Sequence, residues 1–113
     1  MRRPAKHFAT PAAAALAKEV GSALRAARVA RRRTLADAAQ RARVGRMTLN
    51  RIERGDVAVA FGSWLAVIES LGLQQLLAPL ANRTNDAVGE ARRAERTPKR
   101  PRKAPSEDTR HDF

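Results

Sequence analysis

Several residue types are missing or rare in this sequence, and each absence narrows the classes of protein that the chain can represent. There is no cysteine and no tyrosine, and aromatic residues make up only 4% of the 113 residues. Without cysteine, disulfide bonds, thiolate metal sites and cysteine nucleophiles are excluded. The two histidines, His7 and His111, lie near the chain ends, and no serine or threonine lies in a nucleophile or phosphate-loop motif. We therefore expect neither an enzyme nor a protein that needs a cofactor or a metal.

Long apolar runs are also absent, which bears on the compartment of the protein. No run approaches the length of a membrane span. The opening MRRPAKHFATPAAAALAKEV resembles an export signal only superficially, because Lys18 and Glu19 interrupt a very short apolar segment. We expect a cytoplasmic protein.

Acidic residues are scarce relative to basic ones. The chain has 23 Lys and Arg against 11 Asp and Glu, a formal net charge of +12 and a pI of about 11.8. Ten arginines lie between Arg25 and Arg54, where the only acids are Asp37 and Glu53. Such a surface attracts polyanions at long range, so nucleic acid is the first partner to consider. The alternative is that the charged residues only keep the protein soluble, as an ordinary run of charges does.

The stretch TLADAAQRARVGRMTLNRIERG, residues 34–55, predicts two short helices joined by a tight turn. Thr34 is a suitable N-cap, and apolar residues follow at helical spacing to Ala42. Arg43-Val44-Gly45 interrupts the pattern, and a second helix runs from Gly45 to about Arg54, before a C-capping glycine at position 55. This is a helix-turn-helix arrangement, and its coincidence with the arginines favours nucleic acid over a solubilising surface.

The run from about Leu24 to Leu73 resembles the Xre/Cro repressor-like helix-turn-helix family. The segments that carry the resemblance are LRAAR, TLADAA, VGRMTLNRIERG and WLAVIESLGL. The fold class that it implies is all-α, a compact five-helix lambda-repressor-like domain with disordered basic tails. It also implies an ion pair between Arg28 and Glu53, which would join the first helix to the third.

The second helix of the motif supplies the predicted DNA contacts. Leu49 and Ile52 are expected to turn inward. The family's base-reading positions map onto Arg46, Met47 and Arg51, and helical spacing adds Thr48 and Asn50 to the base-contacting set. Arginine can bond a guanine edge bidentately, and methionine can contact a thymine methyl. The predicted phosphate-contacting residues are Thr34, Arg41, Arg43 and Arg54.

Two positions depart from the family pattern. Arg43 stands where relatives usually have glycine in the turn, so a left-handed backbone there would cost roughly 1–2 kcal/mol, or the turn must differ. Leu35 stands where many relatives have a glutamine that reaches a phosphate. Nearby arginines would have to replace that contact electrostatically.

Three segments are predicted from composition. They are a basic N-terminal arm over residues 1–10, the helix-turn-helix domain over 11–81 and a disordered charged tail over 82–113. Within the domain we expect a first helix from about Pro11 to Arg32, in which Gly21 costs about 1 kcal/mol relative to alanine. A further helix should run from the Phe61 region to Leu71, followed by a short one disturbed by Pro79. A short helix over residues 87–96 is an option within the tail. The PKRPRK cluster is either a site for DNA backbone or an acidic partner, or simply a solvated part of the tail.

The leading functional prediction is a sequence-specific, autoregulatory transcriptional repressor that binds double-stranded DNA. A homodimer would match a palindromic operator. Two alternatives stay open. LGLQQLL and the following charged segment resemble HipB-type antitoxins, which implies a HipA-like kinase toxin as partner. A non-specific nucleic-acid-binding protein, held by charge alone, is the other.

Overall fold

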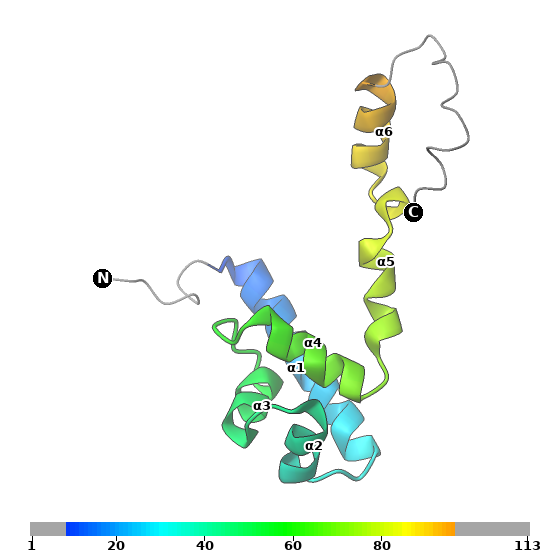
Figure 1. The fold of residues 1–113 in the computed structure, drawn as a ribbon. Coiled ribbons are helices and arrows are strands. Elements are labelled where there is room, and N and C mark those ends of the chain that lie inside the picture. The colour runs from blue at the N-terminus through cyan, green and yellow to red at the C-terminus, as the bar shows by residue number, and fades with distance from the viewer. Residues whose placement is uncertain (1–8, 97–113) are drawn as a thin grey trace, which may run out of the picture. The chain divides into compact units, whose positions relative to one another are not determined.

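The computed structural model describes residues 9–96, which form helices joined by short turns and contain no strand (Figure 1). The predicted all-helical fold class is confirmed. The chain divides into two compact units, Met1–Ala78 and Pro79–Phe113, which are described separately below. The described helices are α1 (Pro11–Ala30), α2 (Leu35–Ala42), α3 (Arg46–Glu53), α4 (Phe61–Ser70), α5 (Ala78–Ala81) and α6 (Ala87–Arg96), with 3₁₀ turns η2 (Gln74–Leu76) and η3 (Arg83–Asn85).

The starts of α1 and α2 follow from two threonine caps. The Thr10 hydroxyl accepts the N–H of Ala13 at 3.0 Å, and the Thr34 hydroxyl accepts the N–H of Asp37 at 3.0 Å. Each cap satisfies a backbone donor that has no partner inside its helix. Helix α1 therefore begins at the predicted Pro11, and α2 begins directly after the predicted cap, Thr34.

The first four helices end in the same way, with a left-handed residue and a backbone bond that reaches back five residues. Gly55 and Gly72 take the left-handed position after α3 and α4, with φ of 81° and 75°. Arg32 and Arg43 take it after α1 and α2, with φ of 55° and 59°. This is the Schellman arrangement, which satisfies the last carbonyls of a helix. Arg32 thus ends α1 at Ala30, two residues before the predicted end.

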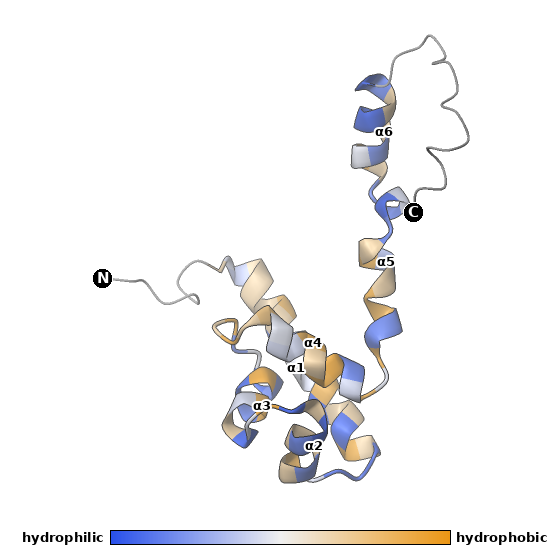
Figure 2. Cartoon of the chain, viewed as in Figure 1, coloured by the Kyte–Doolittle hydropathy of each residue, from blue (hydrophilic) through white to orange (hydrophobic). Residues whose placement is uncertain are grey.

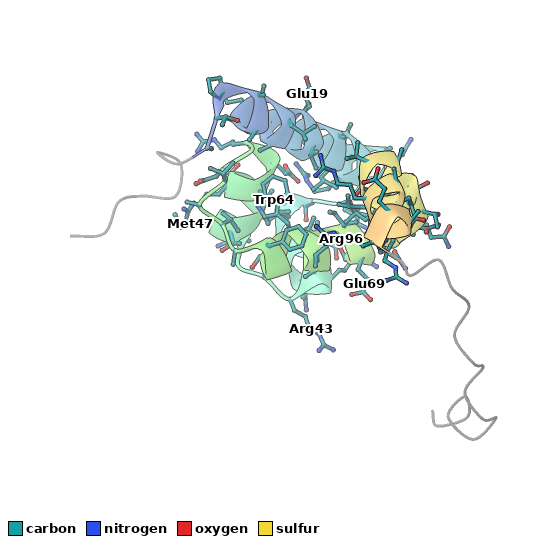
Figure 3. The ribbon with its side chains drawn as sticks, turned by 90° about the horizontal axis from the view of Figure 1, so that it is seen from above. Glu19, Arg43, Met47, Trp64, Glu69 and Arg96 are labelled. Carbon is teal, nitrogen blue, oxygen red and sulfur yellow. The ribbon has the colours of Figure 1, made fainter. Side chains whose placement is uncertain are left out.

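The core of the first unit lies where α1, α2 and α4 meet α3. Leu49 and Ile52 of α3 are 1% and 0% exposed. Trp64 lies among the helices in Figure 3 and is 9% exposed. The other buried apolar residues are Leu24, Ala38, Ala39, Ala42, Val59, Val67, Ile68 and Leu71. Because α3 contacts α1, α2 and α4, its orientation is set by three neighbours.

Gly21 lies in the middle of α1 and is required there by packing. A Cβ at this position would lie 2.3 Å from the Ile52 carbonyl oxygen and 2.9 Å from the Gly55 nitrogen. Both atoms are backbone, so they cannot move aside cheaply. The sequence prediction took account of the helix propensity of Gly21 alone and missed this packing role, in which the glycine lets α1 approach the end of α3 closely.

The predicted fifth helix is reduced to η2 and a single turn, α5. Leu73 and Leu77 pack against the core, whereas Leu76 and Leu80 are 74% and 82% exposed. In the second unit, the Asp86 carboxylate accepts the N–H of Gly89 at 3.0 Å and caps α6. The tail over residues 82–113 was predicted to be disordered with an optional helix over 87–96, and its described part instead forms η3 and α6. This helix is mostly hydrophilic, in contrast to α4 (Figure 2), and has no buried residue.

Candidate nucleic-acid interface

The turn between α2 and α3 keeps its left-handed residue although that residue is arginine. Arg43 has φ 59° and ψ 39°, and its N–H bonds to the Gln40 carbonyl at 3.1 Å. The next N–H, of Val44, reaches the Ala39 carbonyl at 3.0 Å. The turn therefore keeps the left-handed backbone that relatives form with glycine, and the arginine bears the steric cost of that conformation. The Arg43 side chain extends outward from the unit (Figure 3).

Helix α3 begins after Gly45, which adopts the extended backbone of an N-cap with φ −72° and ψ 157°. One side of the helix is buried through Leu49, Ile52 and Glu53. The opposite side is open, and Met47, at 79% exposed, points outward in Figure 3. Arg46, Asn50 and Arg51 are also exposed, and Thr48 is half-buried. All five residues predicted to contact bases are thus at least partly accessible.

Arg28 of α1 binds Glu53 at the end of α3, the pair that the family resemblance implied. Arg28 Nε donates to Glu53 Oε2 at 2.7 Å, and Nη2 donates to Oε1 at 3.1 Å. The side chains of Arg28 and Glu53 are only 13% and 4% exposed. The hydrogen bond to the Glu53 carboxylate raises the pKa of the Arg28 guanidinium, with the nearby negative charge acting in the same direction and burial opposing both. A bidentate, enclosed pair of this kind fixes relative geometry as well as charge.

The same arginine connects the pair to the rest of the unit. Arg28 Nη1 donates to the Arg33 carbonyl at 2.9 Å, and Arg33 Nη1 donates to the Ser70 carbonyl at 3.2 Å. The series joins α1, the end of α3, the α1–α2 loop and the end of α4. The bonds of Arg33 were not predicted, because nothing in the local sequence indicates which carbonyl its side chain reaches.

Two of the arginines predicted to contact DNA have acidic neighbours. Arg51 Nε donates to Asp56 Oδ2 at 2.9 Å, and Arg41 Nε donates to Asp37 Oδ2 at 3.2 Å. The Arg51 and Arg41 side chains remain 49% and 54% exposed, so solvent weakens both pairs. The Arg41 pair has the ordinary i, i+4 helical spacing. Sequence reasoning missed the pairing of Asp56, which lies between the capping Gly55 and the helix predicted from the Phe61 region.

The predicted phosphate-contacting residues are all exposed and lie at helix ends. Thr34 caps α2, Arg41 is in its last turn, Arg43 follows it, and Arg54 follows α3. Leu35, by contrast, is half-buried and packs against the core. A leucine at this position therefore contributes to packing.

We compared the sequence with models of known protein families. A helix-turn-helix domain model matches residues 19–80, more than half of the chain. The chain belongs to this helix-turn-helix family. Its helix-turn-helix motif comprises α2, the turn at Arg43 and α3. A search of the curated proteins and one of the solved structures find no match for this helix-turn-helix protein.

Some predictions concern parts of the helix-turn-helix protein outside the described residues. These are most of the basic N-terminal arm, both histidines and the PKRPRK cluster, which lie within residues 1–8 and 97–113. In residues 9–96, no helix is both long enough and apolar enough to cross a membrane.

Proposed function

We propose that this protein is a sequence-specific transcriptional repressor that binds an operator in double-stranded DNA through α3, and that it controls its own promoter. The observation that carries the proposal is the division of α3 between a buried side and an open, arginine-bearing side. A helix held in this way can enter the major groove without disturbing the core. The activity is binding, with no catalytic step.

The open side of α3 offers three kinds of base contact. Arg46 and Arg51 each carry a planar guanidinium that can bond a guanine edge bidentately, and each such contact discriminates by about 1–3 kcal/mol. Met47 is apolar and highly exposed, which suits contact with a thymine methyl. Asn50 and Thr48 complete the base-contacting set with shorter polar side chains.

Phosphate contacts are assigned to side chains around α2 and after α3. Thr34 uses its hydroxyl oxygen to cap α2, which leaves its O–H able to donate to a phosphate. Arg41, Arg43 and Arg54 supply positive charge on the same two elements. Contacts of this kind set the register of the protein on DNA, whereas the α3 side chains read sequence.

Charge-driven, non-specific nucleic-acid binding is the second candidate, and the net charge of +12 favours it. It predicts affinities that fall with salt equally for all DNA sequences. A specific repressor instead prefers its site by about 10³-fold or more over random DNA. The two functions therefore predict different ratios of the affinity for the operator to the affinity for random DNA, measured at one salt concentration.

We propose a homodimer as the binding species, which would match two half-sites of a palindromic operator. Leu76, at the end of the first unit, is 74% exposed and supplies apolar area for such a contact. A HipA-like kinase toxin is the alternative partner, and it would make the protein an antitoxin. Light scattering on the purified protein should give twice the monomer mass, whereas a monomer that forms a complex with a kinase from its native operon would favour the toxin.

The test of the proposed function is a binding titration against the protein's own upstream promoter and a shuffled fragment of equal length. A salt concentration of ~150 mM suppresses much of the electrostatic term. The repressor predicts a preference of at least about 10³-fold for the promoter. Equal binding to both fragments would reject autoregulation and favour charge-driven binding.

A further inference from the structure

The carboxylate of Asp56 is held in place just after α3. Asp56 follows the left-handed Gly55, and its N–H bonds to the Arg51 carbonyl at 3.0 Å. Its Oδ1 accepts the N–H of Ala58 at 2.9 Å. These backbone bonds fix the side chain where the helix ends, and it is 27% exposed.

The other oxygen of the same carboxylate holds Arg51 on the open side of α3. Asp56 Oδ2 accepts from Arg51 Nε at 2.9 Å. A guanidinium presents five N–H donors in a rigid plane, and the Nε–H lies on one edge of that plane. A bond through Nε constrains the orientation of the plane and does not use the Nη1 and Nη2 donors. Two parallel N–H groups of these nitrogens match the O6 and N7 acceptors of guanine.

We propose that Asp56 is a positioning residue that sets the sequence specificity of Arg51. This inference rests on the proposed function. Asp56 favours the end-on arrangement of Arg51 toward a guanine and reduces the entropy that the long side chain loses on binding. Its negative charge also opposes the use of Arg51 on a phosphate, which would strengthen binding to every sequence. Asp56 therefore lowers the affinity for DNA of any sequence and raises the preference for guanine at the position that Arg51 contacts.

The test is selection of binding sites from a random duplex DNA pool by the wild-type full chain and three variants. Arg51→Ala identifies the operator position at which Arg51 selects guanine. Asp56→Asn keeps an oxygen for the Ala58 N–H but removes the charge and the acceptor that faces Arg51. We expect it to reduce the guanine preference at that same position about 10-fold, within the range of one base contact, while affinity for shuffled DNA rises.

Asp37→Asn is the matched control, because Asp37 binds Arg41 through the same pair of atoms on a different helix. It changes the net charge equally and should strengthen binding to all DNA without changing the guanine preference. In the Arg51→Ala background, Asp56→Asn should alter the preference less than about 2-fold, because independent sites add and coupled sites do not. The Trp64 fluorescence melt confirms that each variant is folded.

The outcomes separate the inference from the function on which it rests. A wild-type protein that enriches no sequence would reject the proposed function and the Asp56 inference with it. Enrichment by the wild type, with an unchanged guanine preference in Asp56→Asn, would overturn the Asp56 inference alone. An equal loss of preference in Asp37→Asn would also overturn it, because net charge would then be the cause.

Discussion

The two sides of α3 use the same residue types for different purposes. On the inner side, an acid of α3, Glu53, is 4% exposed and binds Arg28 with both oxygens. On the outer side, Arg51 is 49% exposed and binds Asp56 through one nitrogen. Enclosure makes the first pair a structural link whose loss is costly, whereas the second pair, exposed to solvent, contributes little to the stability of the fold. Burial therefore decides which ion pair maintains the fold and which is available to a partner.

The largest expected effect comes from breaking the inner pair. Glu53→Gln preserves shape but leaves the Arg28 charge enclosed without its carboxylate, at a cost of about 3–5 kcal/mol. For a unit of this size, the melting temperature should fall by more than about 10 °C. The single tryptophan, Trp64, is buried in the unit, so its fluorescence can follow unfolding.

Asp37→Asn provides the exposed control for Glu53→Gln, since it also changes an acid to its amide. Its pair with Arg41 is largely solvated, and the loss should stay below about 1 kcal/mol. Similar melting temperatures for the two variants would mean that enclosure does not distinguish the pairs.

Gly21 gives the second largest effect, because it lies at the close contact between α1 and the inner side of α3. Gly21→Ala forces a Cβ against the Ile52 carbonyl oxygen and the Gly55 nitrogen. We expect a loss of about 1–3 kcal/mol, as for other overpacked sites, measured by chemical denaturation.

Gly62→Ala in α4 is the matched helical control, because an added Cβ there meets nothing within 4 Å. It should be neutral or stabilise by up to about 1 kcal/mol. If Gly21→Ala were stabilising as well, close approach between α1 and α3 could not be the reason for glycine.

The smallest effect is expected at Arg43, where conformational cost and charge can be separated. Arg43→Gly removes the left-handed strain and should stabilise the fold by about 1 kcal/mol. If Arg43 contacts a phosphate, the slope of log affinity against log salt should fall by about 1.

Arg32 offers the comparison for Arg43, since it is also left-handed but was not assigned to DNA. Arg32→Gly should give a similar gain in stability with an unchanged salt slope. Equal slopes for Arg43→Gly and the wild type would remove Arg43 from the phosphate-contacting set.

Most helix starts of the first unit could be predicted because their signals are local, whereas the end of α1 was predicted two residues too late. Thr10 and Thr34 start helices, and Gly55 and Gly72 end them, each through bonds within a few residues. The requirement for glycine at position 21 could not be predicted, since it depends on a carbonyl from α3, far along the chain.

The candidate site was predicted as a set of exposed positions on α3, and its helix was placed to within one residue. The Arg28–Glu53 pair followed from the family resemblance. The Arg51–Asp56 bond was missed because it crosses the reversal at Gly55, where spacing along a helix no longer indicates which side chains meet. The contact that each exposed residue makes with DNA stays a prediction.

The central claim is that the inner side of α3 maintains the fold while the outer side reads DNA. The most direct test is the Arg46→Ala, Arg51→Ala double variant, with its melting temperature and its promoter preference measured together. We predict a melting temperature within about 5 °C of the wild type, because an exposed pair contributes at most about 1 kcal/mol, and a promoter preference that falls to that of shuffled DNA. A folded double variant that keeps its preference for the promoter would contradict the claim.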